Sequence, residues 1–329
     1  MLDERKAAIL RSIVEAYIHT AQPVGSTQVV SSTDLNVSSA TIRNDMVVLE
    51  RDGFLAQPHT SAGRIPTEKG YRFFVDHLAQ GQLASADVHT VHSFFDRAHL
   101  QLEQLLADTS RLLSNVTSYA AVVVGPPHEV ATVRSVQVVR LSDQLAVLVL
   151  VLSNGAVERR TLDLEVDTPD EDLFAVAARL AASMVDHPLT DIADPPTEGL
   201  HRVDLLVAAG LAACRHIDPT PVYVGGASKM ATAFSAIETV RAVLAVLEEQ
   251  YVVVSLLRDT LSRGLNVAIG TETGVAPLAE CALVVAPYLV DGQSVGSIGV
   301  LGPTRMNYSQ ALAAVAVVSN QLGERLRKG

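Results

Sequence analysis

Residues 38–64 read SSATIRNDMVVLERDGFLAQPHTSAGR, and this stretch decides how the N-terminal part of the chain folds. Ser38 is suited to cap a helix, and apolar residues recur behind it at steps of three and four. Gly53 stands where a glycine commonly follows the end of a helix. The stretch therefore predicts a helix from Ser38 to about Asp52, and its apolar face consists of Ile42, Met46 and Leu49.

Further helices flank this one, and a short hairpin follows it. Two helices precede it, over Asp3–Thr20 and Thr27–Ser32. After it come a strand at Phe54–Gln57, a polar tip up to Arg64, a return strand at Ile65, and a helix through Leu78 that Thr67 caps. The order helix, helix, helix, hairpin is typical of a winged helix-turn-helix, whose second motif helix enters the major groove of DNA.

The start of the Ser38 helix and the hairpin tip carry side chains suited to DNA. Arginine can bind guanine bidentately, and asparagine can bind adenine in the same way. Hydroxyl, imidazole and guanidinium groups at the tip suit phosphates or the minor groove, and two basic residues on the following helix extend the patch. The same residues would also fit an ordinary solvated surface. The candidate DNA-binding residues are Ser39, Thr41, Arg43, Asn44, His59, Thr60, Ser61, Arg64, Lys69 and Arg72.

The net charge of −11 is unfavourable for a DNA-binding protein, because attraction to phosphate needs cations. Residues 1–80 contain nine acidic and eight basic residues, so almost all of the excess acidity belongs to the rest of the chain. Any basic surface in the N-terminal part must therefore come from local clustering.

The composition, 48% hydrophobic and 19% charged, indicates packed globular domains. Cys214 and Cys281 lie far apart, which argues against a disulfide framework and fits a reducing compartment. The N-terminus lacks an apolar signal region, and the longest clean apolar run, Leu145–Leu152, is too short to cross a bilayer. We therefore expect a soluble, cytoplasmic protein with no membrane partner.

The sequence gives little support for an enzyme. It contains no HExxH, and Gly225–Lys229 lacks the spacing of a phosphate-binding loop. We expect no catalytic residue and no cofactor.

Residues 87–117 predict one long helix with an apolar seam in heptad steps. The seam fits either packing on the helix's own domain or pairing with the same helix of a second copy. The helix also carries histidine and aspartate at steps of three and four, a spacing that metal ligands can use. A solvated helix face explains these side chains better, so no metal is expected at His89, His92, Asp96 and His99.

The C-terminal three-quarters of the chain alternates helical and strand patterns. The pattern predicts one sheet domain interrupted by a largely helical insert, which gives an α+β protein overall. The expected strands lie at Ala120–Val124, Val133–Leu141, Gln144–Leu152, Val157–Leu164, Val222–Val224, Val267–Ile269, Leu283–Tyr288 and Ser297–Leu301.

Ordered motifs at both ends of the chain resemble those of a known family. They read SSATIRNDM at 38–46, LE at 49–50, QPHTSAGR at 57–64, PT at 66–67, GYR at 70–72, IG at 269–270, Gly296, GV at 299–300 and GPTRMNY at 302–308. On these motifs the chain resembles the HrcA family of heat-inducible transcription repressors. The match covers essentially the whole chain and is loose over residues 160–240.

The resemblance implies an architecture and a partner set. It implies a winged helix-turn-helix, a GAF-like α/β domain and a dimerisation domain inserted into the latter. It also implies a homodimer that binds the CIRCE inverted repeat upstream of chaperone operons, with activity modulated by a chaperonin of the GroEL type. The expected parts are the DNA-binding domain at 1–80, a linker helix at 81–117, the GAF-like domain at 118–160 and 241–329, and the insert at 161–240.

Two rival functions remain at this point. One is a transcriptional regulator gated by a small molecule in the GAF-like domain, which a large apolar pocket with convergent polar groups would favour. The other is an enzyme with an appended DNA-binding module, which a buried cluster of carboxylates or histidines would favour.

Overall fold

The computed structural model divides the chain into two compact units. The first unit comprises Met1–His99, Leu106–Val124 and Val222–Gly329, and the second comprises Leu100–Leu105 and Gly125–Pro221. The residues described are 2–33, 35, 37–59, 62–79, 81, 83–98, 101–126, 131–153, 157–188, 191–192, 195, 199, 201–215, 220–234, 237–264 and 266–328.

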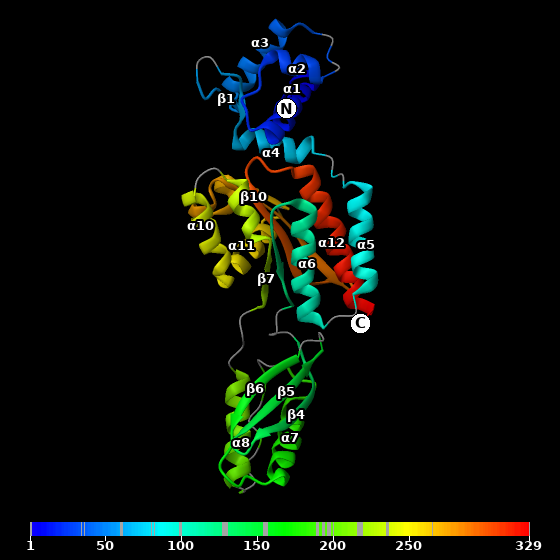
Figure 1. Ribbon diagram of the computed structural model, residues 1–329, viewed down its shortest axis with the longest axis vertical. Coiled ribbons are helices and arrows are strands. Elements are labelled where there is room, and N and C mark those ends of the chain that lie inside the picture. The colour runs from blue at the N-terminus through cyan, green and yellow to red at the C-terminus, as the bar shows by residue number, and fades with distance from the viewer. Residues whose placement is uncertain are drawn as a thin grey trace. The chain divides into compact units, whose positions relative to one another are not determined.

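The N-terminal part of the first unit, which we call the head, is a bundle of helices with a two-stranded antiparallel sheet (Figure 1). Apolar faces of α1, α3 and α4 meet in its core, where Ile9, Ile13, Leu49 and Phe74 are fully or almost fully buried. Its elements are α1 (Glu4–Thr20), α2 (Ser26–Ser32), α3 (Ser39–Arg51), β1 (Leu55–Ala56), β2 (Ile65–Pro66) and α4 (Glu68–His77).

Side-chain caps fix where α3 and α4 begin, as the sequence predicts, whereas α2 begins at Ser26, the residue expected to cap it, and has no side-chain cap. Ser38 Oγ accepts a hydrogen bond from the backbone N–H of Thr41 at the start of α3. Thr67 Oγ1 accepts one from Gly70 at the start of α4. Gly53 follows α3 with a φ of +81°, a left-handed conformation that glycine adopts without strain.

The rest of the first unit, which we call the body, is built on an antiparallel sheet in the order β7-β3-β10-β9-β8. The strands are β3 (Ala120–Val124), β7 (Val222–Gly225), β8 (Val267–Ile269), β9 (Cys281–Val290) and β10 (Gln293–Pro303). The helical elements are α5 (Ser85–Arg97), α6 (Leu102–Thr117), η2 (Ala227–Lys229), α9 (Met230–Ala233), α10 (Ile237–Glu248), α11 (Gln250–Ser262), η3 (Gly270–Thr273), η4 (Ala276–Leu278) and α12 (Tyr308–Lys328).

Helices cover both faces of the body sheet (Figure 1). On one face, α10 and α11 bury apolar side chains such as Leu247 and Leu257 against Leu283 and Leu301 of the strands. On the other face, α12 packs along β9, and α5 lies against α12.

The prediction of a single helix over residues 87–117 is wrong. The backbone leaves the helical conformation at Ala98, with φ −71° and ψ 108°, and α6 begins only at Leu102. Arg325 of α12 donates from Nε to the Ala98 carbonyl at 2.9 Å, which satisfies an oxygen at the end of α5. Phe95 and Leu112, on the two parts of the expected seam, are buried within the chain itself.

The second unit is a three-stranded antiparallel sheet in the order β4-β5-β6, packed on two helices. Burial alternates along β5, where Ala146, Leu148, Leu150 and Leu152 face the helices. Its elements are β4 (Val133–Ser142), β5 (Leu145–Leu152), β6 (Val157–Asp163), α7 (Asp170–Met184) and α8 (His201–Arg215).

This division differs from the expected one, in which an insert begins at residue 161. The strands between 133 and 163 form one sheet with one another and bury their apolar side chains against α7 and α8. They therefore belong to the second unit, whereas β7, expected inside the insert, pairs with β3 of the body. Among the described residues, no helix is long and apolar enough to cross a membrane.

Candidate nucleic-acid interface

The start of α3 separates polar from apolar side chains. Arg43 and Asn44 are exposed, Thr41 is half-buried, and Ile42 and Met46 lie in the core. No hydrogen bond or ion pair joins the Arg43 or Asn44 side chain to the residues that the structure describes. These two side chains are therefore available to a ligand on the outward side of α3.

Bonds to α1 and α2 hold α3 in place. Arg5 of α1 makes two bonds to the Asp45 carboxylate, Nε–Oδ2 at 2.8 Å and Nη2–Oδ1 at 3.2 Å. The hydrogen bond to the Asp45 carboxylate raises the pKa of Arg5. Ser39 Oγ lies 2.9 Å from Ser26 Oγ, which joins the starts of α3 and α2. Sequence reasoning missed the Arg5 bond, although an aspartate inside the apolar face of α3 signals a buried partner.

The hairpin is attached to the loop between α1 and α2. Arg64 and Val24 exchange two backbone hydrogen bonds of 2.9 Å each. A Cβ on Gly63 would lie 2.3 Å from the Val24 carbonyl oxygen, so only glycine fits there. Gln57 Nε2 donates to the Ala62 carbonyl at 3.0 Å and closes the base of the tip.

Among the candidates on the hairpin, Arg64 already binds another side chain of the protein. Its guanidinium contacts Glu50 Oε2 of α3 through Nε at 2.9 Å and Nη2 at 2.8 Å, and its side chain is 14% exposed. His59 is exposed. Thr60 and Ser61 lie outside the described residues.

The side chain of Lys69 binds at the C-terminal end of α3. Its ammonium donates to the Asp52 carbonyl at 2.8 Å and sits 4.6 Å from the centre of the Phe54 ring. A cation at the end of a helix offsets the partial negative charge of the last carbonyls.

Arg72 points from α4 to the body. Its Nε donates to Glu272 Oε1 at 3.0 Å, its Nη2 donates to the Val267 carbonyl at 2.8 Å, and its Nη1 contacts Asp76 at 3.2 Å. Of the four cationic candidates, Arg43 thus differs from Arg64, Lys69 and Arg72, each of which already has a partner.

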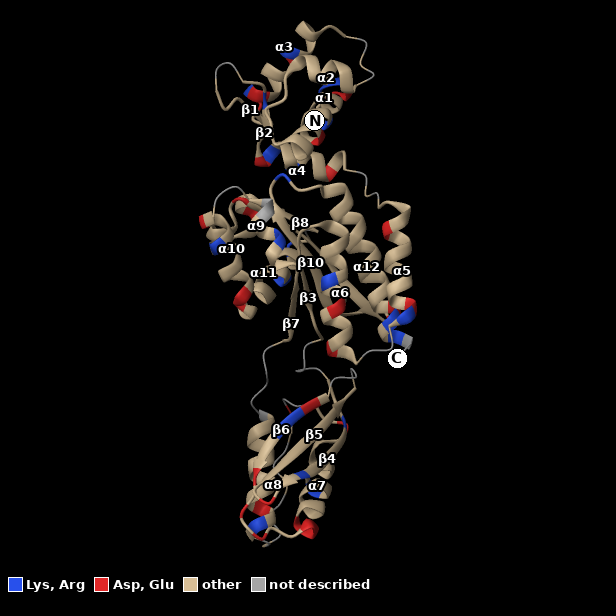
Figure 2. Ribbon diagram, viewed as in Figure 1, with Lys and Arg blue, Asp and Glu red and all other residues tan. Residues whose placement is uncertain are grey.

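Acidic and basic residues are interspersed over the head and not separated into patches (Figure 2).

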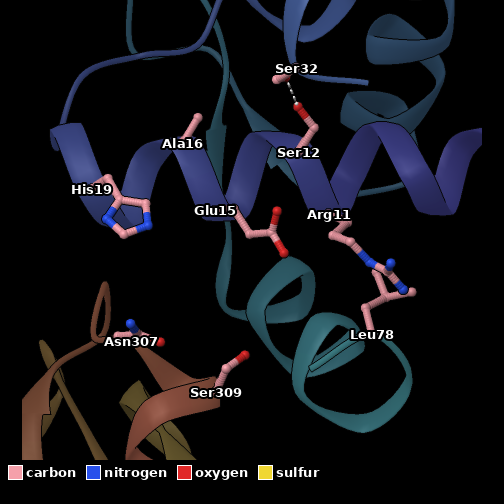
Figure 3. A pocket seen from close by; sticks show the side chains of 9 residues that line it. All are labelled: Arg11, Ser12, Glu15, Ala16, His19, Ser32, Leu78, Asn307 and Ser309. Carbon is pink, nitrogen blue, oxygen red and sulfur yellow. Dashed lines mark hydrogen bonds between the residues drawn. The ribbon is translucent and has the colours of Figure 1, made fainter. Parts of the chain in front are cut away.

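A polar cavity of about 450 Å³ lies beside α1 (Figure 3). Arg11, Glu15 and His19 of α1 line one side, and Asn307 and Ser309 at the start of α12 line the other. The cavity separates these α1 side chains from the start of α12.

In the described part of the chain, no three His, Cys, Asp or Glu side chains come close enough to hold a metal ion. His99, one of the four residues considered for such a site, lies outside that part.

The chain is similar to a known family model and to several curated sequences. The family model of the HrcA protein C-terminal domain matches residues 103–312. A heat-inducible transcription repressor HrcA from Nocardia farcinica is 37% identical, with 98% of this chain and 97% of the relative covered. Repressors of the same name from Acidothermus cellulolyticus and Symbiobacterium thermophilum are 38% and 34% identical, each with 99% of both chains covered.

One solved structure has the same fold over the full length. It is the crystal structure of a protein described as hypothetical, with a TM-score of 0.73, 22% sequence identity, and coverage of 100% of this chain and 99% of that one.

Proposed function

This chain belongs to the HrcA family of heat-inducible transcription repressors, and we propose that it represses as a homodimer bound to an inverted-repeat operator of the CIRCE type. The head acts as the winged helix-turn-helix, the body as the GAF-like domain, and the second unit as the inserted dimerisation domain. In this mechanism a dimer that occupies promoter DNA excludes the polymerase. The protein therefore needs to catalyse no reaction.

The free, outward-facing Arg43 and Asn44 on α3 carry the DNA-reading part of the proposal. Placed in the major groove, α3 would present them to base edges, with Ser39 and Thr41 beside them. The Arg5–Asp45 pair and the Ser26–Ser39 bond hold the helix before DNA arrives, which lowers the ordering cost of binding. His59 and the hairpin tip, including Thr60 and Ser61, would lie on the phosphate backbone or the minor groove.

The uncovered face of the second unit supports dimerisation. Opposite the helix-covered side, β5 presents Val147, Val149 and Val151, which remain only half-buried. On the neighbouring β4, Val139 and Leu141 are 46% and 61% exposed. A second copy related by a two-fold axis would cover this apolar face and match the two-fold symmetry of an inverted repeat.

Control by a chaperonin of the GroEL type completes the proposal. A chaperonin recognises exposed apolar surface, and the sheet face of the second unit supplies such surface whenever the dimer dissociates. Heat would draw the chaperonin to unfolded proteins, and repression would then fall. If the purified protein stays fully active through heat-shock temperatures without chaperonin, this part of the proposal is wrong.

The experiment is a binding titration of purified protein with a CIRCE-type inverted repeat, a shuffled duplex and a single half-site, repeated across salt concentrations. We expect a strong preference for the operator that requires both half-sites. Equal binding to operator and shuffled DNA, with and without added chaperonin, would contradict the proposal. Operator binding that appears only with chaperonin would support chaperonin control.

A further inference from the structure

Helix α4 of the head is bonded to the η3 turn of the body by charged side chains. Glu68 accepts from Thr271, through Oε1 from the backbone N–H at 3.2 Å and through Oε2 from Oγ1 at 2.7 Å. One turn later, Arg72 donates to both carboxylate oxygens of Glu272 and to the Val267 carbonyl. We call these four side chains, Glu68, Arg72, Thr271 and Glu272, the α4 clamp.

The body half of the clamp is held by its own bonds. Glu272 Oε2 accepts from the backbone N–H of Ile269 at 2.9 Å, and Thr273 Oγ1 donates to the Gly270 carbonyl at 2.9 Å. Gly270 has a φ of +57°, and a Cβ there would lie 2.0 Å from Glu68 Oε1. The turn is thus shaped to receive a carboxylate from α4.

One half of the clamp is partly shielded from water. The side chains of Arg72 and Glu272 are 22% and 33% exposed, whereas Glu68 and Thr271 are exposed. The neighbouring ring of Tyr71 packs 5.8 Å from that of Tyr308 in the body. Charge-assisted bonds in such a half-buried place resist rearrangement better than exposed ion pairs do. On the α1 side of the head, by contrast, the polar cavity replaces packing (Figure 3). The α4 clamp therefore joins head and body through polar side chains on the α4 side of the head.

We propose that Arg72 is a positioning residue, which fixes the orientation of the head on the body and does not contact DNA phosphate. The inference rests on the proposed function, a dimer that reads two half-sites. A dimer gains affinity for a full operator when its two heads are held at the spacing of the half-sites, because binding of the second head is then intramolecular. A head released from η3 would still bind a half-site but would lose this alignment.

The test uses full-length Arg72→Ala and Glu272→Ala proteins and three duplexes, namely the operator, a single half-site, and an operator with two base pairs inserted between its halves. We expect each variant to lose about tenfold or more in affinity for the operator and less than about twofold for the half-site. Both should also discriminate less against the insertion than the unsubstituted protein does. The double variant should be no weaker than either single one, since both remove the same connection.

The control is Arg111→Ala, which removes one positive charge from an exposed pair with Asp108 on α6. It should behave as the unsubstituted protein on all three duplexes. Thermal unfolding of every variant separates misfolding from loss of alignment, because a misfolded protein would lose half-site binding as well.

A phosphate contact at Arg72 would give a different pattern. Arg72→Ala would then weaken the half-site and the operator by similar factors and reduce the salt slope by about one unit per contact, while Glu272→Ala would bind as tightly as before or more tightly. That pattern, or tighter operator binding by Arg72→Ala, overturns the inference. An unsubstituted protein without operator preference would instead refute the proposed function.

Discussion

Arg43 is the residue whose change tests base reading most directly. It is exposed and free of protein partners in the described structure, whereas the helix around it is anchored on α1 and α2. We expect Arg43→Ala to cost about 1–3 kcal/mol on the operator and much less on shuffled DNA. Arg51→Ala, at the far end of α3 and similarly exposed, is the matched control and should weaken both DNAs equally and slightly. Equal losses for Arg43→Ala on the two duplexes would defeat its assignment.

A separate prediction concerns Arg64, because its guanidinium forms an ion pair with Glu50. If this pair sets the angle between the hairpin and α3, Arg64→Ala and Glu50→Gln should weaken binding to both DNAs by similar factors and leave the salt slope unchanged. A phosphate contact would flatten the slope for Arg64→Ala alone. Titrations of the two variants over a range of salt concentrations distinguish the two roles.

At the scale of single residues, local pattern predicted the exposed polar side of α3 but not the engagement of the other cations. The exposure of Arg43 and Asn44 follows from helical periodicity around Ile42 and Met46. One partner of Arg72, Glu272, lies 200 positions away, and nothing in the neighbouring sequence indicates that pairing. Sequence reasoning therefore treated Arg72 as part of a continuous basic patch.

At the scale of elements, the hairpin depends on a close approach of two backbones. An added methyl group at Gly63 would meet the Val24 carbonyl oxygen at 2.3 Å, whereas at Gly25 its nearest neighbour would be Thr27 Oγ1 at 3.9 Å. We therefore expect Gly63→Ala to displace the hairpin, destabilise the head by roughly 1–3 kcal/mol and weaken binding to operator and shuffled DNA. Gly25→Ala should leave the position of the hairpin, the stability of the head and the affinity for both DNAs unchanged. Normal DNA binding and an unchanged melting temperature for Gly63→Ala would contradict the arrangement described for Val24 and Arg64.

Element boundaries that depend on local caps were predictable, and those set by distant contacts were not. Ser38 and Thr67 fix the starts of α3 and α4 through their own side chains, and the sequence predicts both. The end of α5 at Arg97 has no comparable signal, because the apolar heptad steps continue through Ala98 and Leu102. Arg325, more than 200 positions away, binds the carbonyl where the helix stops.

At the scale of the whole molecule, the composition of β4, β5 and β6 indicates strands but does not indicate which sheet they join. Alternating Val and Leu residues suit either the body sheet or a sheet of their own, because strand pairing is decided by long-range packing. The apolar residues of α7 and α8 provide that packing in the second unit. The expected domain boundary at residue 161 therefore differs from the observed one by the length of three strands.

The two cysteines allow the opening of each unit to be followed separately. Burial raises the pKa of Cys214, on α8 of the second unit, to about 11, and that of Cys281, on β9 of the body, to about 12. Because the thiolate is the reactive form, both thiols should resist a thiol reagent at pH 8 until their unit opens. The Cys214→Ser and Cys281→Ser proteins each keep a single thiol, whose reaction reports the opening of one unit.

On heating, we expect the Cys214 thiol to react before the Cys281 thiol. Among the described residues, the three-stranded sheet of the second unit packs against helices on one face, whereas helices cover both faces of the body sheet. If a second copy covers the free face, a higher protein concentration should raise the temperature at which Cys214 reacts, since dimerisation stabilises the closed unit by mass action. The temperature for Cys281 should depend less on concentration. Labelling of Cys214 that is independent of concentration would place the dimer contact outside the second unit, and earlier labelling of Cys281 would show that heat opens the body first.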